Sequence, residues 1–225
     1  MSGKSSDIGT VRDVYARHQI KKIAARWDAR ADSWDQALED SACHLNEDDA
    51  YRRFLRVIQR LVAQRRQFCA NQGVIDVGCG TGLVLAKVIS AFAWGIGVDI
   101  SPQMVRVARA KCLAKTNFLI GDCFRLPELC PKAGAVLSRG VLLSHYGREQ
   151  GRAILEAARS ALAPGGFLVF DFLNEAARTQ HRHTPDNKFW FTGEEIQAMA
   201  RHAGFAAAST VGSPNRRVLL LLAEM

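Results

Sequence analysis

The sequence predicts an α/β protein built on a doubly wound, mostly parallel sheet, and three observations lead to that prediction. From residue 73 onward, short apolar runs alternate with helical patterns, the order of elements that places helices on both faces of a parallel sheet. The first five runs are almost continuously apolar, as strands buried on both faces are. The 225 residues are 48% hydrophobic and 23% charged, a composition typical of a globular protein large enough to bury a core.

Helices are the only elements expected before residue 73. Apolar residues recur there at spacings of three and four, which indicates amphipathic helices. They are Ile20, Ile23, Ala24 and Trp27 in one stretch, and Phe54, Leu55, Ile58, Leu61 and Val62 in another. We therefore divide a single domain into an N-terminal helical segment, residues 1–70, and a sheet-containing core, residues 71–225.

Seven strands are expected in the core. The last two are joined by a Gly-Ser-Pro-Asn turn, so we expect an antiparallel hairpin at one edge of the sheet. The expected strands are Val74–Val77, Gly95–Asp99, Thr116–Ile120, Ala133–Ser138, Phe167–Phe172, Ala206–Val211 and Val218–Ala223.

The helices between the strands have clear boundary signals. Ser101 precedes a proline, which predicts an N-cap followed by the first helical residue. Thr192 and Glu195 form a capping box, and Gly204 ends that helix. The segment Leu162–Gly166, with the sequence LAPGG, is expected to stop the helix before the fifth strand.

Composition narrows the class of protein. No apolar run approaches the ~18 residues that span a bilayer, and the polar start MSGKSSDIG does not resemble a secretory signal. The six cysteines form no CxxC pair, so we expect reduced thiols in the cytoplasm and no metal site. The net charge of +8 is compatible with an acidic partner, but the densest basic stretch, residues 52–66, has helical spacing and favours a solvated helix face over a nucleic-acid surface.

A glycine-rich loop follows the first strand, in the sequence VIDVGCGTG from Val74 to Gly82. Glycines let the backbone turn sharply and approach a ligand closely. The spacing is GxGxG rather than the GxGxxG of a dinucleotide site. Asp76 lies in the approach to the loop, where its carboxylate would repel a pyrophosphate and favour a cation. Taken alone, the loop is equally compatible with an ordinary turn of an α/β protein.

Two acids follow the next two strands. Asp99 ends the second strand 23 residues after Asp76, a position from which it can accept both ribose hydroxyls. An Asp that caps the next helix is the alternative, although Ser101 is better placed to do so. Asp122 follows the third strand and can accept from an adenine amino group. The loop and both acids thus lie at successive strand ends, where open α/β sheets bind ligands.

The ordered set VIDVGCGTG, GVDISPQM, LIGDC and LAPGGFLVFDF resembles the class I S-adenosylmethionine-dependent methyltransferases over about residues 70–225. The resemblance implies a Rossmann-like fold, S-adenosylmethionine as cofactor and S-adenosylhomocysteine as product. The cofactor-binding residues that it implies are Asp76, Gly78, Cys79, Gly80, Gly82, Asp99, Ile100, Met104, Asp122, Cys123, Ser138 and Arg139. Arg139 can instead reach the cofactor or substrate carboxylate, and Met104 can equally be a plain core residue.

The N-terminal segment repeats a Trp-Asp pair at Trp27 and Trp34. This pattern resembles small-molecule members of the family, in which N-terminal helices form a lid over the cofactor and shape the acceptor pocket. The resemblance assigns that role to residues 1–70 here. Simple packing of two tryptophans on one helix face is the alternative.

His145 follows the fourth strand and is the candidate general base; a hydrogen-bonded histidine beside a helix is the alternative. The long loop Asn174–Phe191 contains His181 and ends in aromatic residues that can stack on a planar substrate or join the core. The candidate substrate-binding residues are Trp27, Trp34, His44, Tyr146, Asp171, His181 and Trp190.

The function expected from these residues is methyl transfer from S-adenosylmethionine to an oxygen or nitrogen of a small, planar molecule, with a place in specialised metabolism. Catalysis would depend mainly on positioning. An RNA or protein methyltransferase is the alternative, and a cofactor-binding protein without catalysis a further one. The expected partners are a small-molecule substrate and at most a second copy of the chain, with no membrane and no nucleic acid.

Overall fold

The computed structural model describes residues 20–36, 50–140, 142–180 and 188–225. Its centre is a seven-stranded sheet in the order β3-β2-β1-β4-β5-β7-β6, in which β7 runs antiparallel to both of its neighbours. The strands are β1 (Gly73–Val77), β2 (Trp94–Asp99), β3 (Thr116–Ile120), β4 (Ala133–Ser138), β5 (Leu162–Leu173), β6 (Ala207–Val211) and β7 (Val218–Glu224). The predicted mostly parallel sheet with an antiparallel C-terminal hairpin is confirmed, and β6 is the edge strand.

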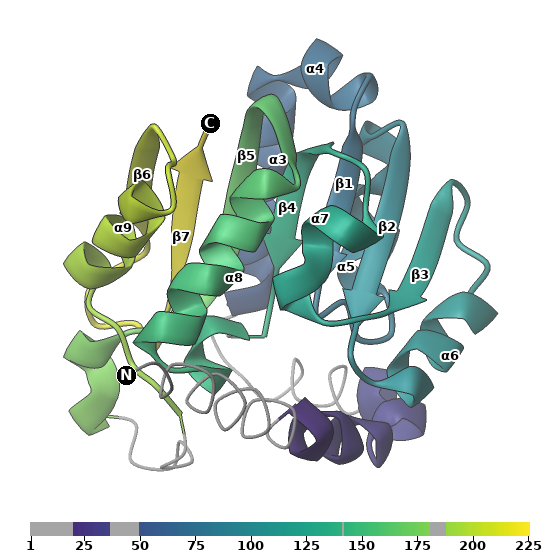
Figure 1. Ribbon diagram of the computed structural model, residues 1–225, viewed down its shortest axis with the longest axis horizontal. Helices are drawn as coiled ribbons and strands as arrows, with labels where there is room; N and C mark the ends of the chain where they lie inside the picture. Colours follow the sequence, from purple (N-terminus) through teal and green to yellow (C-terminus); the bar gives the residue numbers. More distant parts are fainter. Residues whose placement is uncertain (1–19, 37–49, 141, 181–187) are drawn as a thin grey trace, which may run out of the picture.

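Helices cover both faces of the sheet, with α8 in front of it and α3 and α5 behind it in the view of Figure 1. The α-helices are α3 (Ala50–Gln64), α4 (Arg66–Ala70), α5 (Leu83–Val88), α6 (Pro102–Ala110), α7 (Leu126–Leu129), α8 (Arg148–Ser160) and α9 (Gly193–His202). The shorter 3-10 turns are η1 (Ala31–Ser33), η2 (Ile89–Ala91), η3 (Cys123–Arg125), η4 (Leu142–His145) and η5 (Glu175–Gln180). None of the described helices is long and apolar enough to cross a bilayer.

The predicted helix boundaries hold at α6 and α9. The Ser101 hydroxyl accepts from Met104 N at 3.1 Å, and the Thr192 hydroxyl accepts from Glu195 N at 3.1 Å. Gly204 takes a positive φ of 91° just after the second of these helices. Each cap satisfies a backbone donor that the first turn of a helix would otherwise leave without a partner.

The start of the fifth strand differs from the prediction. The segment LAPGG lies within β5 instead of forming a turn before it, because α8 already ends at Ser160. The pairing with β4 jumps from Leu162 opposite Ala133 to Phe167 opposite Ala135. Gly165 takes a φ of +76° in this irregular stretch, a conformation that glycine adopts at little cost.

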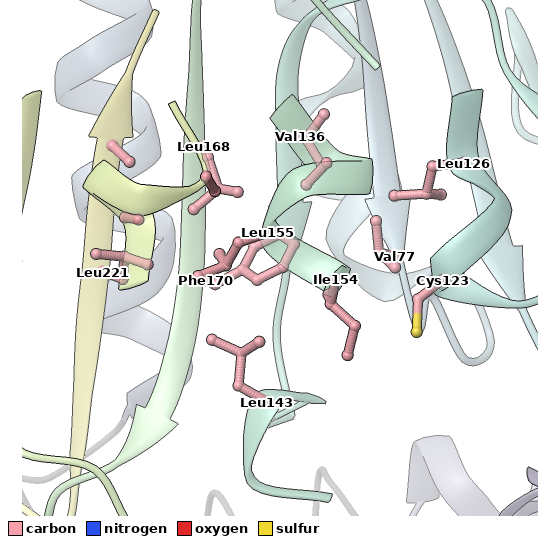
Figure 2. Packing of buried hydrophobic residues seen from close by; sticks show 14 of the residues in the cluster. Val77, Cys123, Leu126, Val136, Leu143, Ile154, Leu155, Leu168, Phe170 and Leu221 are labelled. Atoms are coloured by element: carbon pink, nitrogen blue, oxygen red, sulfur yellow. The ribbon is translucent and has the colours of Figure 1, made fainter. Parts of the chain in front are cut away.

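Two apolar cores hold the helices to the sheet. One joins α7, α8 and α9 to one face, and Figure 2 shows it with Phe170 of β5 and Leu155 and Ile154 of α8. The other joins α3, α5 and α6 to the opposite face, and it includes Phe54 of α3, which is 0% exposed, and Val74 of β1. Helix α3 therefore packs as part of the layer that covers the sheet, although it belongs to the predicted segment 1–70.

Residues 20–36 lie across the carboxyl ends of the strands, beside α6, in purple in Figure 1. Two aspartates fasten this segment. Asp28 accepts hydrogen bonds from the Ser101 hydroxyl and the Gln103 backbone. Asp35 accepts from the Thr81 hydroxyl of the glycine-rich loop. The segment is thus tied to the loops after β1 and β2, and it covers the edge of the sheet where the site lies.

Candidate functional site

A cavity of about 430 Å³ lies at the carboxyl ends of the parallel strands, within the size range of small-molecule sites. It is lined by the loops after β1, β2, β3 and β4, by the end of β5, by the start of β7 and by residues of the N-terminal segment. The predicted site residues that line it are Trp27, Trp34, Asp76, Gly78, Cys79, Gly80, Asp99, Ile100, Met104, Cys123, Ser138, Arg139, His145, Tyr146 and Asp171. The sheet thus brings these residues together from separate parts of the sequence.

The glycine-rich loop turns sharply against the start of the cavity. Gly78 N donates to Val98 O at 2.7 Å, and Gly78, Gly80 and Gly82 all have positive φ angles. A Cβ added to Gly78 would meet nothing within 4 Å, whereas one added to Gly82 would lie 2.8 Å from the Phe118 ring. Gly78 therefore leaves open space beside the backbone. Gly82 does not line the cavity, and a larger residue there would clash with the Phe118 ring.

Asp76 is 1% exposed, and its Oδ2 atom has no hydrogen-bond partner. Burial, together with the nearby Asp99 carboxylate, raises the pKa of Asp76 to about 8. The same burial raises the pKa of the Cys79 thiol, so that group stays neutral. A buried carboxylate with a free oxygen is strongly stabilised by a cation, and the ammonium group of S-adenosylmethionine fits this position.

Asp99 is held between the glycine-rich loop and α6. Its Oδ2 accepts from Gly80 N at 2.8 Å, and its Oδ1 accepts from Ser101 N at 2.9 Å. Burial raises the pKa of Asp99, and these two N–H donors act against that shift. The carboxylate is therefore fixed in position before any ligand binds, with lone pairs left over for the two ribose hydroxyls.

The predicted adenine region is only partly assembled. Met104, 2% exposed, and Ile100 line the cavity. Asp122 does not line it; its Oδ1 accepts from Phe124 N at 2.6 Å and caps η3. Its neighbour Cys123 does line the cavity, and burial raises the pKa of the Cys123 thiol. The binding of an adenine amino group by Asp122 stays a prediction.

Ser138 ends β4, Arg139 follows it, and both residues line the cavity. The Ser138 hydroxyl donates to Val77 O at 2.7 Å, which links β4 to β1. The Arg139 guanidinium lies 5.3 Å from the centre of the Tyr51 ring, and its buried Nε has no hydrogen-bond partner in the described part of the chain. A guanidinium held over an aromatic ring with a free N–H is suited to bind a carboxylate.

The far end of the cavity is aromatic. The Trp27 and Trp34 rings meet edge to face with centroids 5.0 Å apart, and His145 lies 6.4 Å from Trp27. Tyr146, 4% exposed, also lines the cavity, and burial raises the pKa of its phenol. The tryptophans that the sequence placed on one helix face therefore contact each other and also line the cavity.

His145 has a close cationic neighbour. Lys188 Nζ lies 2.8 Å from Nδ1 and 2.6 Å from Nε2 of the ring. Burial, then Lys188 and Arg26, lower the pKa of His145 to about 3. The imidazole is therefore neutral at pH 7, which leaves it able to accept a proton but makes it a weak base until a ligand changes its surroundings.

The other predicted substrate-binding residues have mixed outcomes. Asp171 lines the cavity, and both of its oxygens accept from Gly140 N at 3.0 Å. Trp190 is 6% exposed and does not line the cavity. Its predicted part in substrate binding therefore has no support from the cavity and stays a prediction. His44 and His181 lie outside the described residues, as does Cys43. The five cysteines that the structure describes are free thiols.

Sequence reasoning missed several groups at the site. The repeated Trp-Asp pair was a usable signal for Asp28 and Asp35, which fasten the segment that carries both tryptophans. Lys188 and Arg217 lie beside the cavity without any local motif. Only the pairing of β5 with β7 and the contact with His145 bring these two cations to the site.

Comparisons with known proteins agree with this geometry. Residues 74–166 match the profile of a family described as "Methyltransferase domain". The ubiquinone biosynthesis O-methyltransferase of Idiomarina loihiensis is 31% identical over 109 residues, which are 47% of this chain and 44% of that protein, so this match spans less than half of the relative. The protein of the same name from Paraburkholderia xenovorans is 30% identical over 178 residues, 76% of this chain and 67% of that protein.

The solved structure of a DhpI–S-adenosylhomocysteine complex has the same fold, with a TM-score of 0.67 at 20% identity over 91% of this chain and 95% of that chain. Sequence profile, curated relative and fold thus lead to one family. The chain belongs to the class I S-adenosylmethionine-dependent methyltransferases, with a Rossmann-like core.

Proposed function

We propose that this methyltransferase transfers a methyl group to an oxygen atom of a small, planar acceptor. The observation that carries the proposal is the single cavity, which joins the acids at the ends of β1 and β2 to the aromatic walls of Trp27, Trp34 and Tyr146. Flat aromatic walls suit a planar ring. The curated relatives named above are O-methyltransferases, which supports oxygen over nitrogen as the acceptor atom.

Three polar parts of the cofactor, its ammonium, ribose hydroxyls and carboxylate, have a matching group in the first half of the cavity. When bound, S-adenosylmethionine supplies an electrophilic methyl group on a sulfonium. Asp76 would hold its ammonium, Asp99 its ribose hydroxyls, and Arg139 its carboxylate. These groups are already fixed by backbone hydrogen bonds, burial or the Tyr51 ring, so little reorganisation is needed on binding.

Residues of the second half of the cavity would place the acceptor. Trp27, Trp34 and Tyr146 would orient the ring and exclude water, and a near-attack geometry of this kind supplies about 7–11 kcal/mol in favourable cases. His145 would take the proton of the acceptor hydroxyl; burial, then Lys188 and Arg26, keep its ring neutral in the free protein. Residues 20–36 would act as the lid that the resemblance assigns to the N-terminal segment.

The test is methyl transfer from labelled S-adenosylmethionine to a panel of phenols and catechols, with the product identified by mass spectrometry. We expect labelled methyl ethers from the wild type. His145→Ala should lower turnover more than it lowers affinity for S-adenosylhomocysteine, and the exposed His202 on α9 provides the matched control, His202→Ala. Label that appears in RNA or protein instead of any phenol would overturn the proposal.

A further inference from the structure

Three cationic side chains gather at the aromatic end of the cavity, and we call Arg26, Lys188 and Arg217 the cationic cluster. Lys188 contacts His145, and Arg217 lines the cavity with a buried Nε that has no hydrogen-bond partner among the described residues. After burial, Arg26 and Arg217 are the causes that lower the pKa of Lys188, to about 8. Arg26 and Arg217 are therefore each close enough to Lys188 to repel its positive charge.

No described carboxylate forms an ion pair with any member of the cationic cluster. Asp171, the acid at this edge of the sheet, is instead bound through both oxygens by Gly140 N. Like charges held together without a counter-ion destabilise a protein. Such an arrangement is relieved when an anion binds between them.

The topology places this anion with the acceptor and not with the cofactor. Arg217 directly precedes β7, whose first residue, Val218, pairs with Leu173 at the end of β5. In the strand order, β4 and β5 separate β7 from β1, whereas the acids matched to the cofactor end β1 and β2. Arg139, the other arginine that lines the cavity, follows β4, which adjoins β1, and is the one within reach of the cofactor carboxylate.

We propose that the cationic cluster binds a carboxylate on the acceptor, so that the substrates are planar hydroxy acids rather than neutral phenols. The proposal rests on the proposed function, since it names the substrate class of the same site. A guanidinium binds a carboxylate through two parallel hydrogen bonds, and an ammonium adds a third donor. Ionisation of the reacting hydroxyl creates only one transient negative charge, and neutral His145 can take that proton. Three cations therefore exceed what the reacting oxygen needs, and they match a permanent anion.

The test compares two probes of almost the same shape, 3,4-dihydroxybenzoate and its neutral amide, 3,4-dihydroxybenzamide. Their affinities are measured by calorimetry on protein saturated with S-adenosylhomocysteine. We expect the wild type to bind the acid at least ten-fold more tightly than the amide. Arg217→Gln should weaken the acid at least ten-fold and change the amide less than two-fold. Arg201→Gln removes an equal charge from the exposed face of α9 and should change neither.

Several outcomes would overturn the proposal. The first is that the acid does not bind, and the second is that the acid and the amide bind the wild type with equal affinity. The third is that Arg217→Gln lowers the affinity for both probes to the same degree. If the amide binds as tightly as the acid and its hydroxyl group loses a proton on binding, the cationic cluster binds the phenolate instead of a carboxylate. If Arg217→Gln does not fold, the wild-type preference and the variant Lys188→Met decide the question.

The binding readout does not depend on turnover, so failure of the subsite and failure of the proposed function are distinguishable. Methylation of neutral phenols without any preference for the acid would retain the proposed function and exclude the subsite. Tight binding of the acid through Arg217 without methyl transfer to any phenol would do the reverse.

Discussion

Asp76 and Asp99 are two carboxylates buried at the same cavity, and each has a raised pKa. Burial, and after it the Asp99 carboxylate, raises the pKa of Asp76, so the ligand-free protein keeps Asp76 protonated up to about pH 8. Under the proposed function, a bound ammonium group would reverse this preference. Asp76 would then cost stability in the free protein and contribute affinity in the complex.

Asp76→Asn tests this exchange. The folded-state pKa of Asp76 is about 8, above its ordinary value of 3.8. The protonated side chain therefore favours the folded state fully below pH 3.8, and this contribution to stability is lost as the pH rises through 8. We expect the free variant to melt a few degrees above the wild type at pH 8.5 and near the wild type at pH 5, since ~1 kcal/mol shifts Tm by about 2–4 °C at this size. Its affinity for S-adenosylhomocysteine should fall at least ten-fold by calorimetry. A variant less stable than the wild type at pH 8.5 would contradict the argument.

Burial, and after it the Lys188 ammonium within 2.8 Å of the ring, lowers the pKa of His145. The substitution Lys188→Met removes this positive charge, which is the second largest cause of the lowered pKa of His145. We expect the pKa of His145 to rise from about 3 toward its ordinary value, followed by imidazole NMR titration. A pKa unchanged in Lys188→Met would show that Lys188 does not contribute and that burial and Arg26 account for the shift.

Residues 20–36 are held against the loops after β1 and β2 by Asp28 and Asp35. Asp35 accepts from Thr81 and pairs with Lys111 of the loop after α6 at 2.6 Å. Asp35→Ala leaves Thr81 without that acceptor, and a lost hydrogen bond to a charged group costs about 1.5–3 kcal/mol. We expect faster amide hydrogen exchange over residues 20–36 and a ten-fold or greater loss of affinity for S-adenosylhomocysteine.

Asp32 provides the matched control for this experiment. Asp32 lies in the same segment as Asp35 and pairs with Arg106 of α6, but the Asp32 side chain is 82% exposed. Exposed ion pairs contribute about 0–1 kcal/mol to stability. Asp32→Ala should leave both exchange and affinity near wild-type values. Equal effects of the two substitutions would show that the segment is not held through Asp35.

Most strands of this fold could be predicted because each is a short apolar run between turn residues, and the observed ends differ by at most one residue except in β5. In β5 the residues LAPGG have strong turn preferences, yet pairing of Leu162 with Ala133 keeps them in the sheet. The glycine-rich loop and its acids could be predicted because they are close in sequence to the strand ends. Lys188 and Arg217 could not, because neither has a motif and tertiary contacts alone place them at the cavity.

At the scale of the whole molecule, ligand binding and folding are linked. A ligand at 100 times its Kd stabilises the folded state by about 2.7 kcal/mol, so saturating S-adenosylhomocysteine should raise Tm by about 5–10 °C. Asp99→Ala should lose most of this increase, and its ligand-free Tm should fall below that of the wild type, because Gly80 N and Ser101 N lose the carboxylate that accepts from them. An Asp99→Ala variant with a full ligand-induced shift in a thermal scan would remove Asp99 from the cofactor site.

The strand order also has an evolutionary consequence. The stretch that matches the methyltransferase profile, residues 74–166, contains the glycine-rich loop, Asp76 and Asp99, whereas Trp27 and the cationic cluster lie outside it on both sides. Under the function and subsite that we propose, substitutions in those flanking segments would alter which acceptor binds and would leave Asp76 and Asp99 in place. A gene duplicate could then diverge toward a new substrate while it inherits a working methyl donor site.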